Sequence, residues 1–306
     1  MLLAAVVGFL VYAVRDSWGD AWPRLRAADL GDLGLALAAL AAYYLLFVVG
    51  WQWILAAMGI RIGYGIALQA EMASMLAKYV PGTVWTPLAR ILWLRRVGGV
   101  TSTSVVLSSI LLEAGLSAVA GVLVFVVGLA WVESVDAPLL PLIAFAVTVA
   151  LLIHPRIFRA LARIVFRRFG GAEPPPLGWA TLLGLLVFYA GTWLVGGAAL
   201  FFLLRSVGTA PELETIPFLG GTAAVGAIVA VLSIIAPSGL GVREASMYGL
   251  LLAITVEGAA LGVTLLNRIA ITLVEALLLL AGVVLWGRRR GSSAPPGNEP
   301  IASRGR

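Results

Sequence analysis

Two short motifs in the sequence combine a proline–glycine break with basic side chains that could bind a phosphate group. The first is Lys78-Tyr79-Val80-Pro81-Gly82, and the second runs from Pro237 to Glu244 as Pro-Ser-Gly-Leu-Gly-Val-Arg-Glu. A helix that begins after such a break has free backbone N–H groups and a positive dipole end, which together bind anions. We therefore predict that each motif can hold the phosphate of a lipid head group.

Individual residues of the two motifs suggest separate roles in that binding. Lys78 is the only lysine among 21 basic residues, which favours a compact ammonium charge at this position. Gly239 and Gly241 would let the backbone approach a head group closely. Arg243 could clamp a phosphate through two hydrogen bonds, with Glu244 as its orienting partner or counter-charge. The alternative is that each motif is only a kinked helix or an interfacial turn.

Four further charged side chains interrupt apolar stretches, namely Glu71, Glu113, Arg268 and Glu275. An ionisable group at the centre of a membrane helix costs about 2.5–3.5 kcal/mol on insertion scales, so it needs a partner or water. Glu71 lies seven residues before Lys78, and Arg268 lies seven residues before Glu275, which places each pair on one helix face. These charges are predicted to line a shared polar groove, as partners or coupling groups; the alternative is that they join neighbouring helices.

The composition requires that these groups lie within a membrane protein. Of the 306 residues, 61% are hydrophobic and only 12% are charged, which excludes an ordinary soluble globule. Several apolar runs are long enough to cross a hydrocarbon core of about 30 Å. Runs that are apolar on every face, such as Leu213–Ala236, exclude a transmembrane β-barrel. We therefore predict an all-α fold, a polytopic transmembrane helical bundle.

The pattern of apolar runs and breaks predicts the boundaries of the elements. We expect a single transmembrane domain over residues 1–286 and a disordered cytoplasmic tail over residues 287–306. A polar linker broken by Pro23 is expected over Arg15–Asp32. The expected helical segments are Met1–Val14, Gly31–Ile60, the half-helices Ile62–Val80 and Thr83–Leu94, Thr103–Trp131, Ala137–Ile153, Leu177–Leu204, Thr215–Ala236, a short helix ending at Val256, and Gly258–Trp286.

Clusters of arginine next to apolar runs predict the orientation of the chain. An interfacial basic helix is expected over residues 155–169, with one face formed by Arg156, Arg159, Arg163 and Arg167. This face would gather anionic lipid, at about 1 kcal/mol for each arginine near the surface. By the positive-inside rule, this helix, Arg90, Arg95, Arg96 and the run 288–290 lie in the cytoplasm, and so does the C-terminus. The expected location is the cytoplasmic membrane.

This orientation makes the two interrupted segments enter the membrane from opposite faces. Interruptions of this kind, in corresponding halves of a chain, are typical of transporters built as inverted repeats, whose binding site lies where the broken helices meet. We predict two interrupted or re-entrant helix pairs arranged as an inverted repeat, with halves of about 31–153 and 177–286.

The residues of both motifs resemble those of the lysylphosphatidylglycerol synthase transmembrane family, also described as the flippase-like domain family. The resemblance covers most of Gly31–Trp286. The residues on which the resemblance is based are Lys78-Tyr79-Val80-Pro81-Gly82, Trp85, Arg90, Gly98-Gly99-Val100, Leu111-Leu112-Glu113 and the stretch from Pro237 to Ala245. Thr83 and Ser238 depart from the usual family pattern.

The resemblance implies a domain that moves, or helps to move, anionic or polyisoprenyl-phosphate-linked lipids between leaflets. Only about twenty residues follow Trp286, so lysyl transfer from tRNA is not expected. Together, the motifs and the resemblance give these candidate lipid-binding residues: Lys78, Tyr79, Pro81, Gly82, Trp85, Arg90, Gly239, Gly241, Arg243 and Glu244.

The hypothesis that the protein is an enzyme has less support from the sequence. Cysteine is absent and His154 is the only histidine, so we expect no metal site, no cofactor and no catalytic residue. No nucleic-acid partner is expected, and self-association of the chain is left open. One alternative is a membrane glycosyltransferase that uses the carboxylates of Asp16, Asp20, Asp29 and Asp32. Another is a non-transporting scaffold for the synthesis of envelope lipids or glycans.

Overall fold

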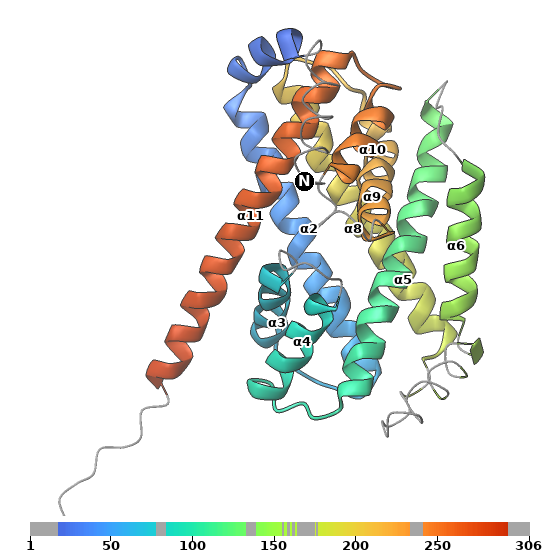
Figure 1. Cartoon of the computed structure of the whole chain (residues 1–306), viewed down its shortest axis with the longest axis vertical. Helices are drawn as coiled ribbons and strands as arrows, with labels where there is room; N and C mark the ends of the chain where they lie inside the picture. The colour runs from blue at the N-terminus through green and yellow to red at the C-terminus, as the bar shows by residue number, and fades with distance from the viewer. Residues whose placement is uncertain are drawn as a thin grey trace, which may run out of the picture.

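The computed structural model describes residues 18–77, 84–132, 139–154, 177–232 and 241–292, together with residues 156, 157, 160, 163 and 175. These residues form an elongated bundle of helices and contain no strand, which confirms the all-α prediction (Figure 1). The expected first helix, Met1–Val14, lies outside the described residues.

The helical boundaries follow the apolar runs of the sequence closely. The elements are α2 (Leu30–Ala57), α3 (Tyr64–Ala77), α4 (Trp85–Arg96), α5 (Thr103–Gly128), η1 (Leu129–Trp131), α6 (Leu139–Ile153), α8 (Trp179–Ser206), η2 (Leu213–Thr215), α9 (Ile216–Leu232), α10 (Val242–Leu251) and α11 (Glu257–Ser292). By length and composition, five helical segments can cross a membrane: Leu30–Ala57, Thr103–Trp131, Trp179–Ser206, Leu213–Leu232 and Glu257–Val283. The protein is therefore a multi-pass membrane protein.

Two expectations at the ends of the chain need adjustment. Residues 18–26 are helical, although a polar linker broken by Pro23 was expected there. Tertiary contacts explain this helix, since Ala21 is completely buried and Arg24 Nη1 donates a hydrogen bond to the carbonyl oxygen of Val207 at 3.3 Å. At the other end, α11 continues to Ser292, past the expected limit at Trp286.

Glycine allows α8 and α9 to pack almost backbone to backbone. A Cβ atom on Gly197 would lie 2.6 Å from the backbone nitrogen of Gly220, and one on Gly220 would lie 2.5 Å from the carbonyl oxygen of Trp193. Small residues are the usual means of close helix packing in membranes, where the hydrophobic effect gives little drive for helix association. Together with α5, these helices form the rigid core beside the cavity described below.

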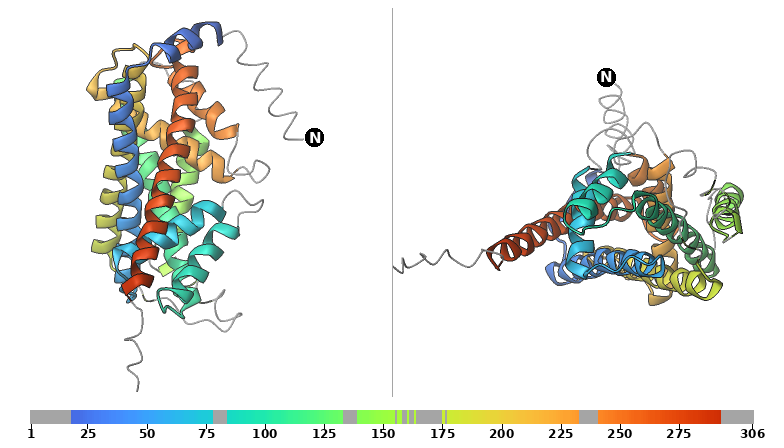
Figure 2. Two further views of the ribbon diagram at one scale, coloured as in Figure 1. Left: turned by 90° about the vertical axis from the view of Figure 1, so that its left-hand side faces the viewer. Right: turned by 90° about the horizontal axis from the view of Figure 1, so that it is seen from below.

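The two interrupted segments each form a pair of helices, as expected. In one pair α3 packs against α4, and in the other α9 packs against α10, so that each break turns the chain back on itself. The first pair lies in the lower half of the bundle in Figure 1 and the second in the upper half. The long helix α11 passes both pairs, as the side view in Figure 2 shows. The breaks themselves, residues 78–83 and 233–240, are outside the described part of the chain.

The predicted basic helix is described only in part. Residues 156, 157, 160 and 163 are helical, and both Arg156 and Arg163 are exposed. Arg159 and Arg167 lie outside the described residues, so the arginine face remains a prediction.

Candidate functional site

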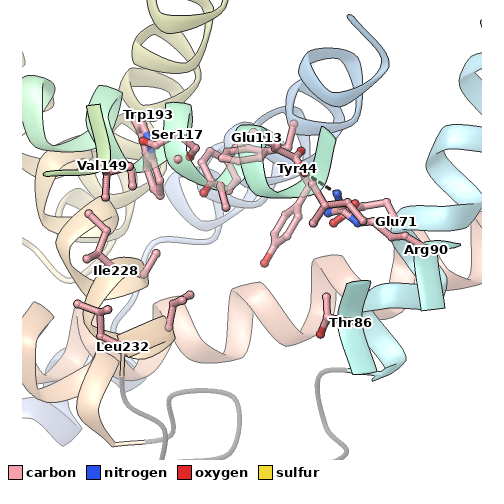
Figure 3. Close-up of a pocket in the computed structure, with 18 residues that line it drawn as sticks. Tyr44, Glu71, Thr86, Arg90, Glu113, Ser117, Val149, Trp193, Ile228 and Leu232 are labelled. Atoms are coloured by element: carbon pink, nitrogen blue, oxygen red, sulfur yellow. Dashed lines mark hydrogen bonds and ion pairs between the residues drawn. The ribbon is translucent and has the colours of Figure 1, made fainter. Parts of the chain in front are cut away.

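A cavity of about 630 Å³ lies between the first interrupted pair and the spans α2, α5, α8 and α9 (Figure 3). Most of its wall is apolar or aromatic, and its charged groups gather at one end. It is lined by Tyr43, Tyr44, Phe47, Glu71, Thr86, Arg90, Ile110, Glu113, Ala114, Gly115, Ser117, Ala118, Val149, Trp193, Ala227, Ile228, Val231 and Leu232.

The charged end consists of one guanidinium between two carboxylates. Arg90, on α4, forms ion pairs with Glu71 of α3 through Nη2 and with Glu113 of α5 through Nη1. The relative exposure of these side chains is 9%, 13% and 7%, respectively. We call these three residues the charged triad. Their pairing follows from the break after α3, because the returning helix α4 brings Arg90 beside Glu71 and against the next span.

Neighbouring polar and aromatic groups hold Arg90 in place. Its Nε atom lies 3.4 Å from Oγ of Ser74, and its guanidinium carbon lies 4.7 Å from the ring centre of Trp51. Trp51 is fully buried, and its indole N–H donates to Oγ of Ser109 at 3.0 Å. A cation over a desolvated indole ring gains about 2 kcal/mol. The guanidinium is thus fixed on all sides rather than free to reach far into the cavity.

The charge balance of the triad is negative. Arg90 supplies one positive charge against two carboxylates, and each of its three nitrogen atoms already contacts an acceptor. In the described part of the chain, Oε1 of Glu113 is buried and has no hydrogen-bond partner. A phosphate at this end would therefore meet an acceptor oxygen and an occupied guanidinium, so Arg90 is poorly placed for the direct phosphate contact expected from the sequence.

The opposite end of the cavity is suited to hydrocarbon. Ile228, Val231 and Leu232 of α9 and Val149 of α6 line this end, and Figure 3 shows Val149, Ile228 and Leu232 away from Arg90 and Glu71. Val231 and Leu232 are 74% and 58% exposed, so the cavity opens to the surface at this end.

An aromatic cluster forms part of the cavity wall. Tyr43 and Phe47 of α2 pack on Trp193 of α8, with ring centres 5.4 Å and 5.9 Å away. The indole N–H of Trp193 donates to the carbonyl oxygen of Ser117 at 2.8 Å. This bond fixes the ring as a wall of the cavity and ties α8 to α5.

A second polar cluster joins α10 to α11. Glu244 accepts a hydrogen bond from the backbone N–H of Gly241 at 2.7 Å, which caps the start of α10, and it ion-pairs with Arg268 at 3.3 Å. Gly241 has φ = +84°, a backbone conformation that favours glycine. On the same long helix, Glu275 accepts a hydrogen bond from the hydroxyl of Tyr44 at 2.7 Å.

Arg243 lies beside this second cluster. Gly226 of α9 offers room for its side chain, because a Cβ atom at that position would lie 3.4 Å from Cγ of Arg243. In the described part of the chain its Nε atom is buried and has no hydrogen-bond partner. Glu244, the orienting partner expected for Arg243, instead contacts Arg268. Arg243 thus keeps hydrogen-bonding capacity for a ligand.

The two clusters have the same layout with the charges reversed. In the first half, Arg90 of the second broken-pair helix binds Glu113 of the following span, 23 residues later. In the second half, Glu244 of the second broken-pair helix binds Arg268 of the following span, 24 residues later. Each interrupted pair is therefore tied by an ion pair to the span that follows it.

The remaining candidates fall into two groups. Lys78, Tyr79, Pro81, Gly82 and Gly239 lie outside the described residues. Trp85 is the first residue of α4, is 43% exposed and does not line the cavity.

Two of the four carboxylates of the glycosyltransferase alternative have structural roles, whereas Asp20 is exposed and Asp16 lies outside the described residues. Asp29 caps α2 by accepting from the backbone N–H of Asp32 at 2.8 Å, and Asp32 ion-pairs with Arg205 at 3.4 Å. Within the described residues, no three histidine, cysteine or acidic side chains lie close enough together to hold a metal ion.

Sequence reasoning missed the partners that hold the charges in place. Trp51 and Tyr44 stand in an apolar stretch that does not mark them as partners of a charge, yet they contact Arg90 and Glu275. The available signal was that each charge within an apolar helix requires a partner on a neighbouring helix.

These features define a class: multi-pass helical membrane proteins with interrupted helix pairs and an internal cavity that is charged at one end and open to the surface at the other. The chain belongs to the lysylphosphatidylglycerol synthase transmembrane region family, whose model matches residues 1–282. Comparison with curated protein sequences gives no match. The family identifies the chain as a membrane protein involved in lipid handling.

Proposed function

We propose that the protein is a lipid translocase that moves an anionic or polyisoprenyl-phosphate-linked lipid between the leaflets of the cytoplasmic membrane. The observation that carries this proposal is the two-ended cavity. Its apolar end opens at Val231 and Leu232, where lipid chains can enter, and its other end carries buried polar groups. The hydrocarbon chains of a lipid suit the apolar end of this cavity.

The phosphate would bind at the breaks rather than at Arg90. Arg243 has a buried Nε atom without a partner and lies in the first turn of α10, where the helix dipole favours an anion. Lys78 belongs to the other break and would supply a second positive charge. The charged triad would then hold the first interrupted pair in position and couple its movement to the lipid.

We interpret the two halves of the chain as an inverted repeat. This interpretation is supported by the two interrupted pairs at opposite ends of the bundle and by the matching ion pairs at separations of 23 and 24 residues (Figure 1). In such transporters, one repeat moves against the other around a fixed site. Alternating access would require the ion pairs of the two halves to loosen in turn.

The orientation that we propose places α3, α4 and the C-terminus at the cytoplasmic face. The ends of α6 and α11 lie at the same end of the bundle as α3 and α4 (Figure 1). Arg95 and Arg96 are exposed at the end of α4, and Arg156 is exposed just after α6. Exposed arginines at this end are what the positive-inside rule requires of a cytoplasmic face.

Reconstitution tests the proposed translocation. Purified full-length protein would be placed in phosphatidylglycerol-containing vesicles with a trace of fluorescent phosphatidylglycerol or polyprenyl phosphate, and leaflet exchange followed by quenching from outside. We expect wild-type protein to accelerate exchange, and Lys78→Ala and Arg243→Ala to slow it. Arg61→Ala removes an exposed arginine and is the matched control. If neither probe moves faster than in protein-free vesicles, the scaffold alternative gains support.

A further inference from the structure

The charged triad contains two carboxylates and one guanidinium, and no other cation on the described cavity wall balances the second carboxylate. Among the described residues that line the cavity, Arg90 is the only cation, and it faces both Glu71 and Glu113. A net negative charge buried among apolar helices is unstable unless it gains a cation or a proton.

One atom of the triad is positioned to accept a proton. Oε1 of Glu113 lacks a hydrogen-bond partner in the described part of the chain, and the residue is 95% buried, at 5% relative exposure. Its other oxygen, Oε2, receives the Nη1 donor of Arg90. A proton on Oε1 would leave that contact in place and make the triad electrically neutral.

The elements around the triad offer no other charge at this wall. The described surfaces of α6 and α9 contribute apolar residues to the cavity. The ionisable groups that interact electrostatically with the triad or with the tyrosines beside it are Tyr43 and Tyr44 of α2, Tyr189 of α8, Arg243 of α10 and Glu275 of α11. Asp32, Arg95, Arg96 and Arg205 lie in the end turns of their helices. Tyr44 donates to Glu275, and Arg243 is not among the residues that line the cavity.

We propose that the charged triad binds one proton, on Oε1 of Glu113, and that loading and release of this proton couple lipid movement to the proton gradient across the membrane. A divalent metal is a poorer occupant, because hard cations require six or more oxygen ligands and the described residues hold no cluster of three metal-ligating side chains. The coupling rests on the proposed function, whereas the proton binding itself does not.

Proton binding is tested without any transport measurement. The full-length protein in phosphatidylglycerol vesicles is titrated while infrared difference spectra record the C=O stretch of protonated carboxyl groups. Wild-type protein should show a reversible band that Glu113→Gln loses. Glu71→Gln should lose it too, because one carboxylate then faces one guanidinium and the remaining pair is neutral.

Controls separate a specific loss from misfolding. Glu214→Gln removes an exposed carboxyl group on η2 and should keep the band. Circular dichroism and gel filtration establish that each variant is folded, and if Glu113→Gln does not fold, Glu71→Gln decides the outcome. Persistence of the wild-type band in Glu71→Gln, or in a folded Glu113→Gln, overturns the proposal.

The coupling is tested by imposing a pH gradient across vesicles that contain fluorescent phosphatidylglycerol. The gradient should accelerate exchange by wild-type protein and by Glu214→Gln, and this acceleration should be lost in Glu71→Gln. A band without any lipid exchange refutes the proposed function but leaves the proton site standing. Exchange without a band, or acceleration by a sodium gradient alone, refutes the proton site and leaves lipid translocation standing.

Discussion

Replacing Arg90 by methionine is the most direct test of the way that the charged triad supports the fold. The substitution keeps an unbranched apolar side chain against Trp51 but leaves Glu71 and Glu113 facing each other without a cation. Removing one partner of a buried ion pair costs about 3–5 kcal/mol, because the remaining charge is uncompensated. The loss of a desolvated cation–π contact adds up to about 2 kcal/mol. We therefore expect Arg90→Met to lower the free energy of unfolding by at least about 3 kcal/mol.

The assay is unfolding of the purified protein in mixed micelles, followed by circular dichroism as the fraction of denaturing detergent rises. Arg95→Met is the control on the same helix, because Arg95 is exposed and should contribute less than about 1 kcal/mol.

A rescue variant tests the reason for the loss. Combining Arg90→Met with Glu71→Gln and Glu113→Gln removes all three charges and should recover most of the stability. The reasoning is refuted if Arg90→Met unfolds with the Arg95→Met control, or if the rescue variant is as unstable as Arg90→Met alone.

Three further changes test the packing and capping around the cavity, each by the same unfolding assay. Gly197→Ala should destabilise the protein by about 1–3 kcal/mol, because the added Cβ would clash with the backbone of α9. The control is Gly191→Ala, which should be neutral or mildly stabilising because no atom lies within 4 Å of the added Cβ. Equal effects of the two substitutions would contradict the close packing of α8 and α9. Trp193→Phe should cost about 0.5–1.5 kcal/mol, since it removes the hydrogen bond from the indole N–H to the carbonyl oxygen of Ser117, which keeps its acceptor role within α5, and an unchanged midpoint would argue against that bond. Asp29→Ala should cost about 0.5–2 kcal/mol through loss of the cap on α2, with Asp29→Asn as the variant that should retain most of the stability; a large loss in Asp29→Asn would point to another role.

The long spans could be predicted from the sequence because one physical requirement dominates them. A stretch that crosses a membrane must be apolar and helical over about 20 residues, whatever its neighbours are. The expected Gly31–Ile60 and Leu177–Leu204 therefore correspond to Leu30–Ala57 and Trp179–Ser206. The half-helices around residues 78–83 were also predicted, because proline and glycine interrupt an apolar rhythm in a recognisable way.

The helix at residues 18–26 was missed although its sequence carries a signal for it. Trp18, Ala21, Trp22 and Leu25 recur at i, i+3, i+4 and i+7, but Pro23 and the charges around them favoured a linker. The structure stabilises it by contacts with distant parts of the chain, such as the bond from Arg24 to Val207, which local patterns do not reveal.

The partners of the charges were the least predictable part of the candidate site. Glu71 was paired with Lys78 on the basis of helical spacing, but the structure pairs it with Arg90, which lies on the helix that returns after the break. Likewise, Arg268 was grouped with Glu275, but it contacts Glu244. Spacing along one helix identifies residues on a common face, whereas the partner across an interface depends on how the helices dock.

The reversed polarity of the two ion pairs has a consequence for how the chain assembles during insertion. Each pair also contacts the other pair's span, since α3 packs on α11 and α9 packs on α5. An exchange of ion-pair partners between these spans would bring Arg90 against Arg268 and Glu244 against Glu113. Juxtaposed like charges in a low-dielectric interior oppose both mistakes. The reversed polarity therefore distinguishes the ion-pair partner of each helix, α5 for α4 and α11 for α10, from the other span that its helix pair contacts.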